Sequence, residues 1–176
     1  MGLDIFIFRY KRTQYEKYKE AQEKWEEEKP ACYDLSEEEY EKLPEEAKNK
    51  VHEEIAKWYE KQPKSEDYGQ EEVGYFRKVN FLVGYFNYEE NCSNQEITMD
   101  EIKMLLERCR EVLKHKSKSK AELLLPVQQG FFFGSYNYDD WYFGDVKEVR
   151  DWCAKIIKEA DQFPDTEYIY LFHCWW

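Results

Sequence analysis

Two short runs of β-branched and aromatic residues stand at opposite ends of this 176-residue chain. Residues 3–10 read Leu-Asp-Ile-Phe-Ile-Phe-Arg-Tyr, and residues 167–176 read Glu-Tyr-Ile-Tyr-Leu-Phe-His-Cys-Trp-Trp. This composition favours β-strands. Because the sequence between the two runs is largely helical in pattern, the simplest partner for each terminal strand is the other. We therefore predict that the two strands pair and bring the chain ends together.

Two segments in the first half of the chain have the spacing of amphipathic helices. Residues 13–29 place aromatic and small side chains at intervals of three and four among many Glu, Lys and Gln residues. Residues 44–61 repeat this arrangement, with Pro44 at a position where helices often begin. We expect two helices, each with one apolar stripe and a wide charged face.

The second half contains two helices with clearer boundaries. Thr98 and Glu101 have the spacing of a capping box, and an apolar face continues from there to about Lys114. A final helix is expected to begin near Asp145 and to end before Pro164, since apolar residues recur between them at helical spacing. Each helix is expected to bury one continuous apolar face.

Three further segments have weaker patterns. Residues 73–87 are apolar nearly all round a helix, so we expect a buried helix there, with a strand as the alternative because of two glycines and many aromatic residues. Residues 131–133 suit a short buried strand, and residues 136–140 suit a turn. The lysine-rich residues 114–120 are expected to form a basic loop.

Together these patterns predict an α+β fold, mostly helical, in which a small antiparallel sheet includes both terminal strands. The polar stretch after Pro63 contains Gly69 and is the best candidate boundary within the chain. We expect residues 1–12 and 64–176 to form the core domain. Residues 13–63 are then an acidic helical insertion or arm.

The net charge of −12 narrows the range of partners. Residues 1–72 hold 21 acidic and 13 basic residues, so the excess of acid lies mainly in the first half. Binding to duplex DNA or RNA requires a basic surface, so we do not expect it. The acidic arm is interpreted either as a solvated helical face or as a mimic of nucleic acid that binds a basic protein.

Several other classes of protein are excluded by missing patterns. No apolar run approaches the roughly 20 residues needed to cross a bilayer, and the first residues lack the pattern of a secretion signal, so we expect a cytoplasmic protein. The chain has five cysteines without a C-x-x-C pair and three histidines far apart in sequence. It also lacks the usual nucleotide-hydrolase, dehydrogenase, zinc-protease and serine-hydrolase motifs. We therefore predict no catalytic residues, no metal and no cofactor.

The remaining candidate for a functional site is a set of polar side chains embedded in aromatic sequence. Aromatic rings stack on planar ligands, amides hydrogen-bond to their edges, and an arginine pairs with an anion. This mixture is typical of a pocket for a planar heterocycle carrying a phosphate. The alternative is structural, with Arg77 pairing with Asp139 or Asp140. The candidate ligand-binding residues are Arg77, Asn80, Gln128, Gln129, Ser135, Tyr138, Asp139, Asp140, Trp141 and Tyr142.

Three segments of the chain resemble a family of uncharacterised bacteriophage and prophage proteins. They are the opening Met-Gly-Leu-Asp-Ile-Phe-Ile-Phe, residues 72–80 reading Glu-Val-Gly-Tyr-Phe-Arg-Lys-Val-Asn, and residues 124–142, which include Gly-Phe-Phe-Phe-Gly-Ser and Tyr-Asp-Asp-Trp-Tyr. The resemblance covers roughly residues 1–10 and 72–160. It implies a phage-related origin and a place in the cytoplasm of an infected or lysogenic bacterial host, but no established activity.

Three functional hypotheses follow, in order of preference. The first is a phage-type accessory binding protein that holds a small anionic or nucleotide-like ligand, such as a nucleotide-derived host defence signal, or that binds a host protein. The second is an acidic inhibitor of a host factor that acts through residues 13–63. The third is a hydrolase of a nucleotide signal that uses Asp139 or Asp140.

Overall fold

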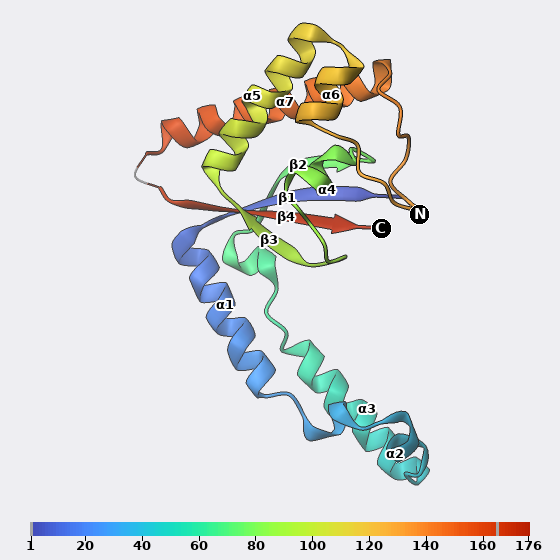
Figure 1. The fold of residues 1–176 in the computed structure, drawn as a ribbon. Helices are drawn as coiled ribbons and strands as arrows, with labels where there is room; N and C mark the ends of the chain where they lie inside the picture. Colours follow the sequence, from blue (N-terminus) through green and yellow to red (C-terminus); the bar gives the residue numbers. More distant parts are fainter. Residues whose placement is uncertain (1, 165) are drawn as a thin grey trace. The chain divides into compact units, whose positions relative to one another are not determined.

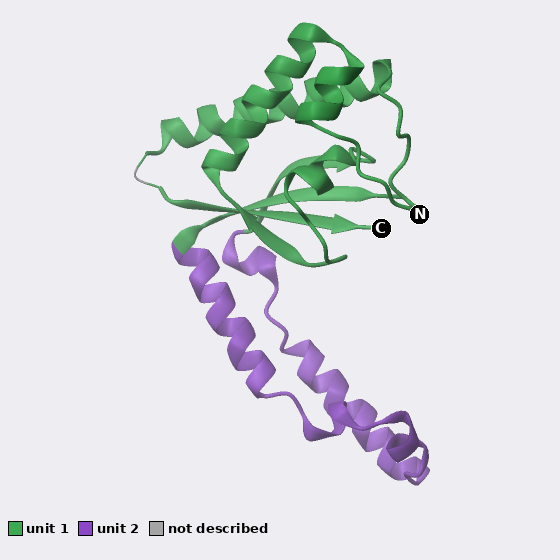
Figure 2. Ribbon diagram, in the orientation of Figure 1, with its two compact units in different colours: residues 1–12, 70–176 green, residues 13–69 purple. Residues whose placement is uncertain are grey.

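The computed structural model describes residues 2–164 and 166–176. The chain is an α+β protein, mostly helical, with one four-stranded antiparallel sheet that includes both terminal strands, as predicted. It divides into two compact units: unit 1 is residues 1–12 with 70–176, and unit 2 is residues 13–69 (Figure 2). The insertion expected from the sequence ended at residue 63, and the compact unit extends to residue 69.

The sheet belongs to unit 1 and has the strand order β2-β1-β4-β3 (Figure 1). Its strands are β1 (Asp4–Lys11), β2 (Glu71–Arg77), β3 (Asn94–Ile97) and β4 (Tyr168–Trp175). Each neighbouring pair is antiparallel. The first and last strands of the chain are therefore the two central strands, which confirms the predicted pairing.

Helices of unit 1 cover one face of this sheet (Figure 1). The main ones are α5 (Met99–His115) and α7 (Asp140–Gln162), joined by the short α6 (Lys118–Leu124), while α4 (Phe81–Tyr85) follows β2. Thr98 and Glu101 form the predicted capping box at the start of α5. The expected apolar faces are buried, and their fully buried members are Ile102, Leu105, Cys109, Val112, Val146, Val149, Cys153 and Ile156.

The pleat of the two central strands supplies the other side of this core. Alternate side chains of β1 point toward the helices, and Ile5 and Ile7 are completely buried there, as is Leu3 directly before the strand. Phe172 and Cys174 of β4 are equally buried and belong to the same apolar cluster. A strand pair with one face fully buried has a strongly specified register, because a slip of one residue would turn these side chains to the other face.

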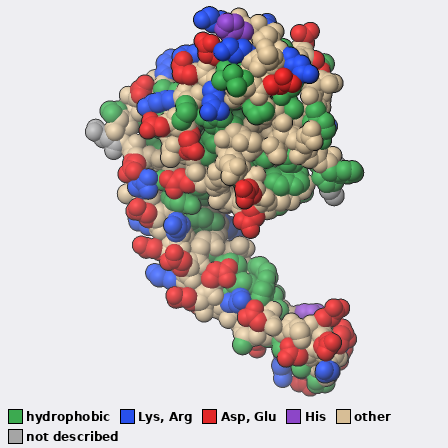
Figure 3. All heavy atoms as spheres, in the orientation of Figure 1, with side chains coloured by type: hydrophobic (Ala, Val, Ile, Leu, Met, Phe, Trp, Pro, Cys, Tyr) green, Lys and Arg blue, Asp and Glu red, His purple; other side chains and the backbone are tan. Residues whose placement is uncertain are grey.

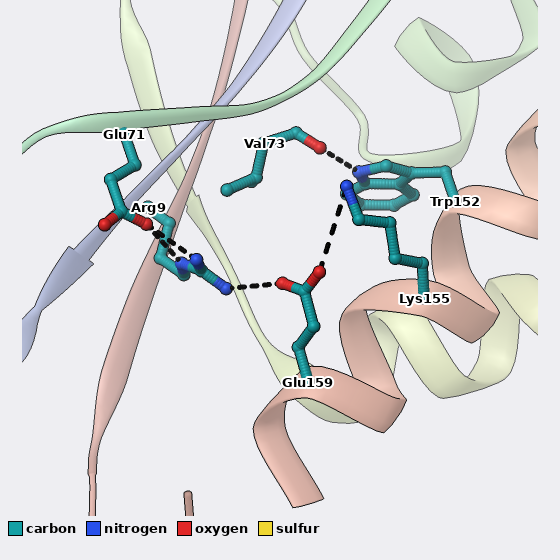
Figure 4. A network of polar contacts seen from close by, with 6 residues as sticks. All are labelled: Arg9, Glu71, Val73, Trp152, Lys155 and Glu159. Atoms are coloured by element: carbon teal, nitrogen blue, oxygen red, sulfur yellow. Dashed lines mark hydrogen bonds and ion pairs between the residues drawn. The ribbon is translucent and has the colours of Figure 1, made fainter. Parts of the chain in front are cut away.

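A polar network ties α7 to β1 and β2 at the edge of the core (Figure 4). Arg9 hydrogen-bonds to Glu71 at 2.6 Å and to Glu159 at 2.9 Å, and the Trp152 indole donates to the Val73 carbonyl at 2.9 Å. Burial opposes the charge of Arg9, but the hydrogen bonds to the two carboxylates outweigh it and raise the pKa of Arg9. The guanidinium therefore stays charged and holds the helix to the sheet.

Unit 2 consists of helices and short connections. It contains α1 (Arg12–Glu27) except for its first residue, α2 (Glu37–Glu41), α3 (Glu45–Glu60) and two 3₁₀ helices, Ala31–Asp34 and Ser65–Tyr68. Both helices expected from the sequence are present.

The centre of unit 2 is a pair of tryptophans. Trp25 of α1 and Trp58 of α3 stack with ring centroids 4.0 Å apart and planes within 5° of parallel. Each indole N–H donates to the backbone carbonyl of the other residue at 2.8 Å. Both rings are buried, and both polar atoms are satisfied, so this pair joins the two helices without an energetic penalty for burying N–H groups.

The surface of unit 2 is rich in acid. Residues 13–69 hold 18 acidic and 10 basic residues, a net charge of −8. Figure 3 shows acidic side chains gathered where α2 and the beginning of α3 lie, and these elements supply Glu37, Glu38, Glu39, Glu45 and Glu46. The excess of acid in the first half of the chain is therefore largely a property of this unit.

The prediction of a buried helix over residues 73–87 is wrong for most of these residues. Residues up to Arg77 form β2, Lys78 adopts φ +62°, and only Phe81–Tyr85 is helical. The apolar positions suit a helix, but the same residues alternate across a strand, with Phe76 buried and Tyr75 exposed. Pairing with the free edge of β1 decides between the two.

Other boundaries also differ from expectation. Residues 131–133 form a turn rather than a strand, and the Phe131 side chain is 94% exposed. The helix expected from Asp145 begins at Asp140. The basic loop ends early, because Ser117 caps α6. The short strand β3 was not expected, since four residues provide little pattern.

Two glycines test the packing of α7 against the sheet. A Cβ on Gly74 would lie 2.7 Å from the Trp152 indole nitrogen, whereas a Cβ on Gly144, inside α7, would meet nothing within 4 Å. We expect Gly74→Ala to lower the free energy of unfolding by about 1–3 kcal/mol through overpacking. Gly144→Ala is the matched control and is expected to raise it by about 0.5–1 kcal/mol through helix propensity. Urea unfolding measures both, and equal effects would contradict this packing.

Candidate functional site

A cleft of about 240 Å³ opens in unit 1 where the end of β2, the loop over residues 125–139 and the first turns of α7 meet. It combines aromatic rings with amide, hydroxyl, ammonium and carboxylate groups. The residues that line it are Lys78, Asn80, Phe81, Val127, Ser135, Asn137, Asp139, Trp141, Tyr142 and Asp145.

The wall of the cleft is a loop without regular structure that side chains hold in place. The Asn80 side chain is buried and donates to the carbonyls of Phe133 at 3.1 Å and Ser135 at 2.9 Å. The Tyr142 hydroxyl donates to the Leu125 carbonyl at 2.7 Å. These bonds satisfy backbone groups that no sheet or helix satisfies, so the loop has a defined shape.

Lys78 lies across this loop. Its backbone has φ +62°, and its N–H donates to the Leu3 carbonyl at 2.8 Å. Gly134 makes the crossing possible, because its φ is +91° and a Cβ there would lie 3.1 Å from the Lys78 Cβ. Glycine is thus required at position 134 both for its backbone conformation and for the space it leaves.

Asp139 sets the beginning of α7. One carboxylate oxygen accepts hydrogen bonds from the N–H groups of Trp141 and Tyr142, each at 3.1 Å. The Tyr142 ring is buried, while Trp141 is 84% exposed although it lines the cleft. An indole held in the first turn of a helix with so much free surface offers a flat face to a ligand.

Asp145 adds a second carboxylate to the cleft. Burial, with smaller contributions from the negative charges of Glu148 and Asp139, raises the pKa of Asp145 to about 6. Among the described residues it forms no ion pair. Among the described residues, Lys78 is the one basic residue that lines the cleft, so acid outweighs base there when Asp145 is ionised.

The structure brings together half of the site residues predicted from the sequence. Asn80, Ser135, Asp139, Trp141 and Tyr142 line the cleft. The other five do not line it: Arg77, Gln128, Gln129, Tyr138 and Asp140. Whether the cleft binds a ligand stays a prediction.

The five outside residues have other surroundings. Arg77 ends β2 and interacts with the Tyr75 hydroxyl, and among the described residues it forms no ion pair with Asp139 or Asp140. The helix expected over residues 73–87 would have joined Arg77 to Asn80, but no helix joins them. The Gln128 side chain lies against Gly84 of α4. Tyr138 supports the loop, because its hydroxyl accepts a hydrogen bond from the Val127 N–H at 3.1 Å.

Sequence reasoning missed two charged members of the cleft. Lys78 was assigned to a buried helix, and only its conformation after the end of β2 turns it toward the loop. Asp145 was taken for the start of the last helix, whereas it lies within α7. Its spacing from Trp141 and Tyr142 is four and three residues, so a helix beginning after Asp139 would have placed all three on one side.

We also searched the described residues for metal sites and for reactive cysteines. In the part that the structure describes, no group of three or more His, Cys, Asp or Glu side chains is placed to hold a metal ion. Cys109, Cys153 and Cys174 are buried, and burial raises the pKa of each thiol. They are packing residues rather than nucleophiles.

Comparisons with known protein families, with curated proteins and with solved structures find no match to this chain. None of the helices within residues 2–164 and 166–176 is long and apolar enough to cross a membrane. The candidate site therefore rests on its own geometry and chemistry.

The raised pKa of Asp145 predicts a pH-dependent effect on stability. An unfolded chain ionises this carboxyl near pH 4, whereas the folded chain keeps the proton until about pH 6. Stability is therefore lost as the pH rises through this interval and is not regained above it. Asp145→Asn removes this loss. We therefore expect its free energy of unfolding, relative to that of the wild type, to be about 1–2 kcal/mol higher at pH 7.5 than at pH 4.5.

Urea unfolding of the wild type and the variant at the two pH values measures this difference. Asp140→Asn is the matched control, since Asp140 is exposed and lies outside the cleft. A gain that is the same at both pH values, or that Asp140→Asn reproduces, would contradict the assigned environment of Asp145.

Proposed function

We propose that this chain is a binding protein whose cleft at the beginning of α7 holds a small planar nitrogen heterocycle of the nucleobase type. The observation that supports this most directly is the position of Trp141. Its indole is 84% exposed at the edge of a cleft that also contains Asp145 and Asn80. A stacking face beside hydrogen-bonding groups is the usual arrangement for reading a flat, polar ring.

The polar groups of the cleft favour a ligand that donates hydrogen bonds. An ionised carboxylate only accepts hydrogen bonds, and Asp139 and Asp145 both line the cleft. The exocyclic amino and ring N–H groups of a nucleobase supply matching donors. Burial makes the ionised form of Asp145 unfavourable, and a hydrogen bond from such a donor would stabilise that form.

The size of the cleft limits what it encloses. About 240 Å³ is smaller than the roughly 300–1,000 Å³ typical of sites for drug-sized molecules. The cleft therefore suits a single base with part of its sugar, and a dinucleotide would extend into solvent.

The charge of the cleft changes the expected role of a phosphate. Arg77, expected to pair with the anion, lies outside the cleft, and Lys78 is the one basic residue that lines it in the part of the chain that the structure describes. Two carboxylates oppose a phosphate at close range. We therefore propose that the base is the recognised part of a nucleotide-like ligand, with Lys78 available to a phosphate that projects from the cleft.

The biological setting remains the one proposed from the sequence. A phage accessory protein acting in the cytoplasm of a bacterial host would use such a cleft to sequester a nucleotide-derived host signal. The alternative, an acidic inhibitor of a host factor, draws support from the separate compactness and net charge of −8 of residues 13–69. We do not propose a hydrolase, because Asp139 caps α7 and Asp140 does not line the cleft.

Isothermal titration calorimetry tests the proposed ligand class. The panel comprises adenine, guanine and cytosine nucleosides with their 5′-monophosphates. We expect at least one nucleoside to bind, with Trp141→Leu weakening it about 5- to 150-fold through lost stacking. Asp145→Asn is expected to weaken it about 10- to 150-fold through a lost charge-assisted hydrogen bond.

Matched controls separate the cleft from the rest of the surface. Trp175→Leu removes another exposed indole, and Asp140→Asn removes a neighbouring charge. Neither is expected to change the affinity. Absence of binding across the panel, or equal losses in Trp141→Leu and Trp175→Leu, would overturn the proposal and shift preference to the inhibitor.

A further inference from the structure

Figure 1 shows α5 and α7 on one face of the sheet. The side chains of β1, β2 and β4 that point to the opposite face form a second aromatic surface on unit 1. We call Phe6, Phe8, Tyr75, His173 and Trp175 the aromatic patch. Tyr75 is 44% exposed and Trp175 is 55% exposed. A shallow depression of about 360 Å³ lies over part of the patch. It shares no lining residue with the cleft at α7.

Strand register brings these rings together. Phe6 stands opposite Tyr75 of β2 and opposite His173 of β4. The Phe6 centroid lies 5.1 Å from that of Tyr75, 6.3 Å from that of His173 and 6.0 Å from that of Phe8, whose plane is within 2° of parallel. Because the rings support one another on a paired sheet, the patch is ordered before anything binds.

A β-bulge adds a negative charge to the patch. Ile7 pairs with Gly74, but the next residue, Phe8, pairs with Glu72, so Val73 has no residue opposite. The bulge turns Glu72 to the side of Phe8, and Glu72 lines the depression. Among the described residues, no cation pairs with Glu72.

His173 also lines the depression and adds a hydrogen-bond acceptor. His173 Nδ1 lies 2.9 Å from the Ser93 carbonyl and 3.1 Å from the Asn94 side-chain oxygen, both of which accept hydrogen bonds. The proton of the neutral ring therefore sits on Nδ1, and Nε2 keeps its lone pair. Tyr75 adds no donor, because its hydroxyl donates to Asp4 at 2.6 Å.

A surface of aromatic faces with a carboxylate and an imidazole lone pair is complementary to a cation that carries N–H groups. Phosphate backbones are repelled by it, and residues 1–12 with 70–176 hold 20 acidic and 16 basic residues. Guanidinium is planar and weakly hydrated, so it stacks on aromatic rings better than an ammonium does. The open, shallow form of the depression suits a side chain presented by a larger molecule.

We propose that the aromatic patch is a docking surface for an arginine side chain of a partner protein, stacked on Phe6 and Phe8 and paired with Glu72. This surface is independent of the ligand cleft, so either proposal stands if the other fails. It gives the chain a means of binding a basic protein that does not require the acidic surface of unit 2.

NMR titration of the full chain tests this docking surface. The probe is the peptide acetyl-Gly-Arg-Gly-Arg-Gly-amide, and the matched control peptide carries citrulline, the neutral analogue of arginine, at both positions. We expect saturable shifts of the Trp175 indole and Phe6 amide signals with the arginine peptide, and at least tenfold weaker binding of the citrulline peptide. Equal binding of the two peptides, or no saturable shift with arginine, would overturn the proposal.

Variants locate the binding on the patch. We expect Phe6→Leu to lower the affinity about two- to thirtyfold and Glu72→Gln to lower it about two- to fivefold. Phe131→Leu and Glu122→Gln make the same changes at exposed positions outside the patch and are expected to bind like the wild type. Glu72 is exposed, so its variant keeps the test valid if Phe6→Leu misfolds.

Two other outcomes would also contradict the proposal. If all four variants bind alike, the peptide is held by general acidity rather than by the patch. If an oligothymidylate binds with shifts at Trp175 and binds more tightly to Glu72→Gln, the patch is a stacking platform for single-stranded nucleic acid.

Discussion

Pairing of β1 with β4 is the constraint on which the rest of unit 1 depends. The register is continuous from Asp4 opposite Trp175 to Lys11 opposite Tyr168. One face of this pair is buried under α5 and α7, and the opposite face carries the aromatic patch. Leu3, directly before β1, also anchors the cleft, because its N–H donates to the Phe132 carbonyl while its carbonyl accepts from the Lys78 N–H. The patch and the cleft are therefore positioned by β1 and by the residue directly before it.

The bulge between β1 and β2 gives the adjacent residues Glu71 and Glu72 different roles on opposite faces of the sheet. Glu71 stands opposite Arg9 and joins the network that holds α7, whereas Glu72 stands opposite Phe8 on the other face. Without the extra residue, Val73 would face Phe8, and the aromatic patch would lack its carboxylate. One irregularity in a strand thus serves both the stability of the helix layer and the charge of an exposed surface.

Sequence reasoning succeeds here where one strong pattern acts alone. The terminal strands, the capping box of Thr98 and Glu101, and the apolar faces of α5 and α7 all follow from local composition and periodicity. It fails for residues 73–87, where helical and strand periods both fit and tertiary pairing decides. It also fails at the start of α7, since Asp139 and Asp145 are both acceptable caps and only Asp139 is used.

Only half of the residues predicted for the candidate site line the cleft, because tertiary structure rather than local sequence decides which residues meet there. Three cleft residues are near neighbours in sequence and lie together: Asp139, Trp141 and Tyr142. Lys78 reaches the cleft because its own backbone is left-handed, and Asp145 because α7 begins earlier than expected. A partly buried carboxylate with a raised pKa beside an exposed indole is a costly arrangement for a purely structural surface. That cost is the physical reason for treating the cleft as a binding site.

The most direct test of this account is a crystal structure of the full chain with the nucleoside that binds most tightly. The account predicts electron density for the base stacked on the Trp141 indole, with an amino or ring N–H group within hydrogen-bond distance of the Asp145 carboxylate. Density at any other place in unit 1 or unit 2, or an empty cleft at a saturating concentration of nucleoside, would contradict it.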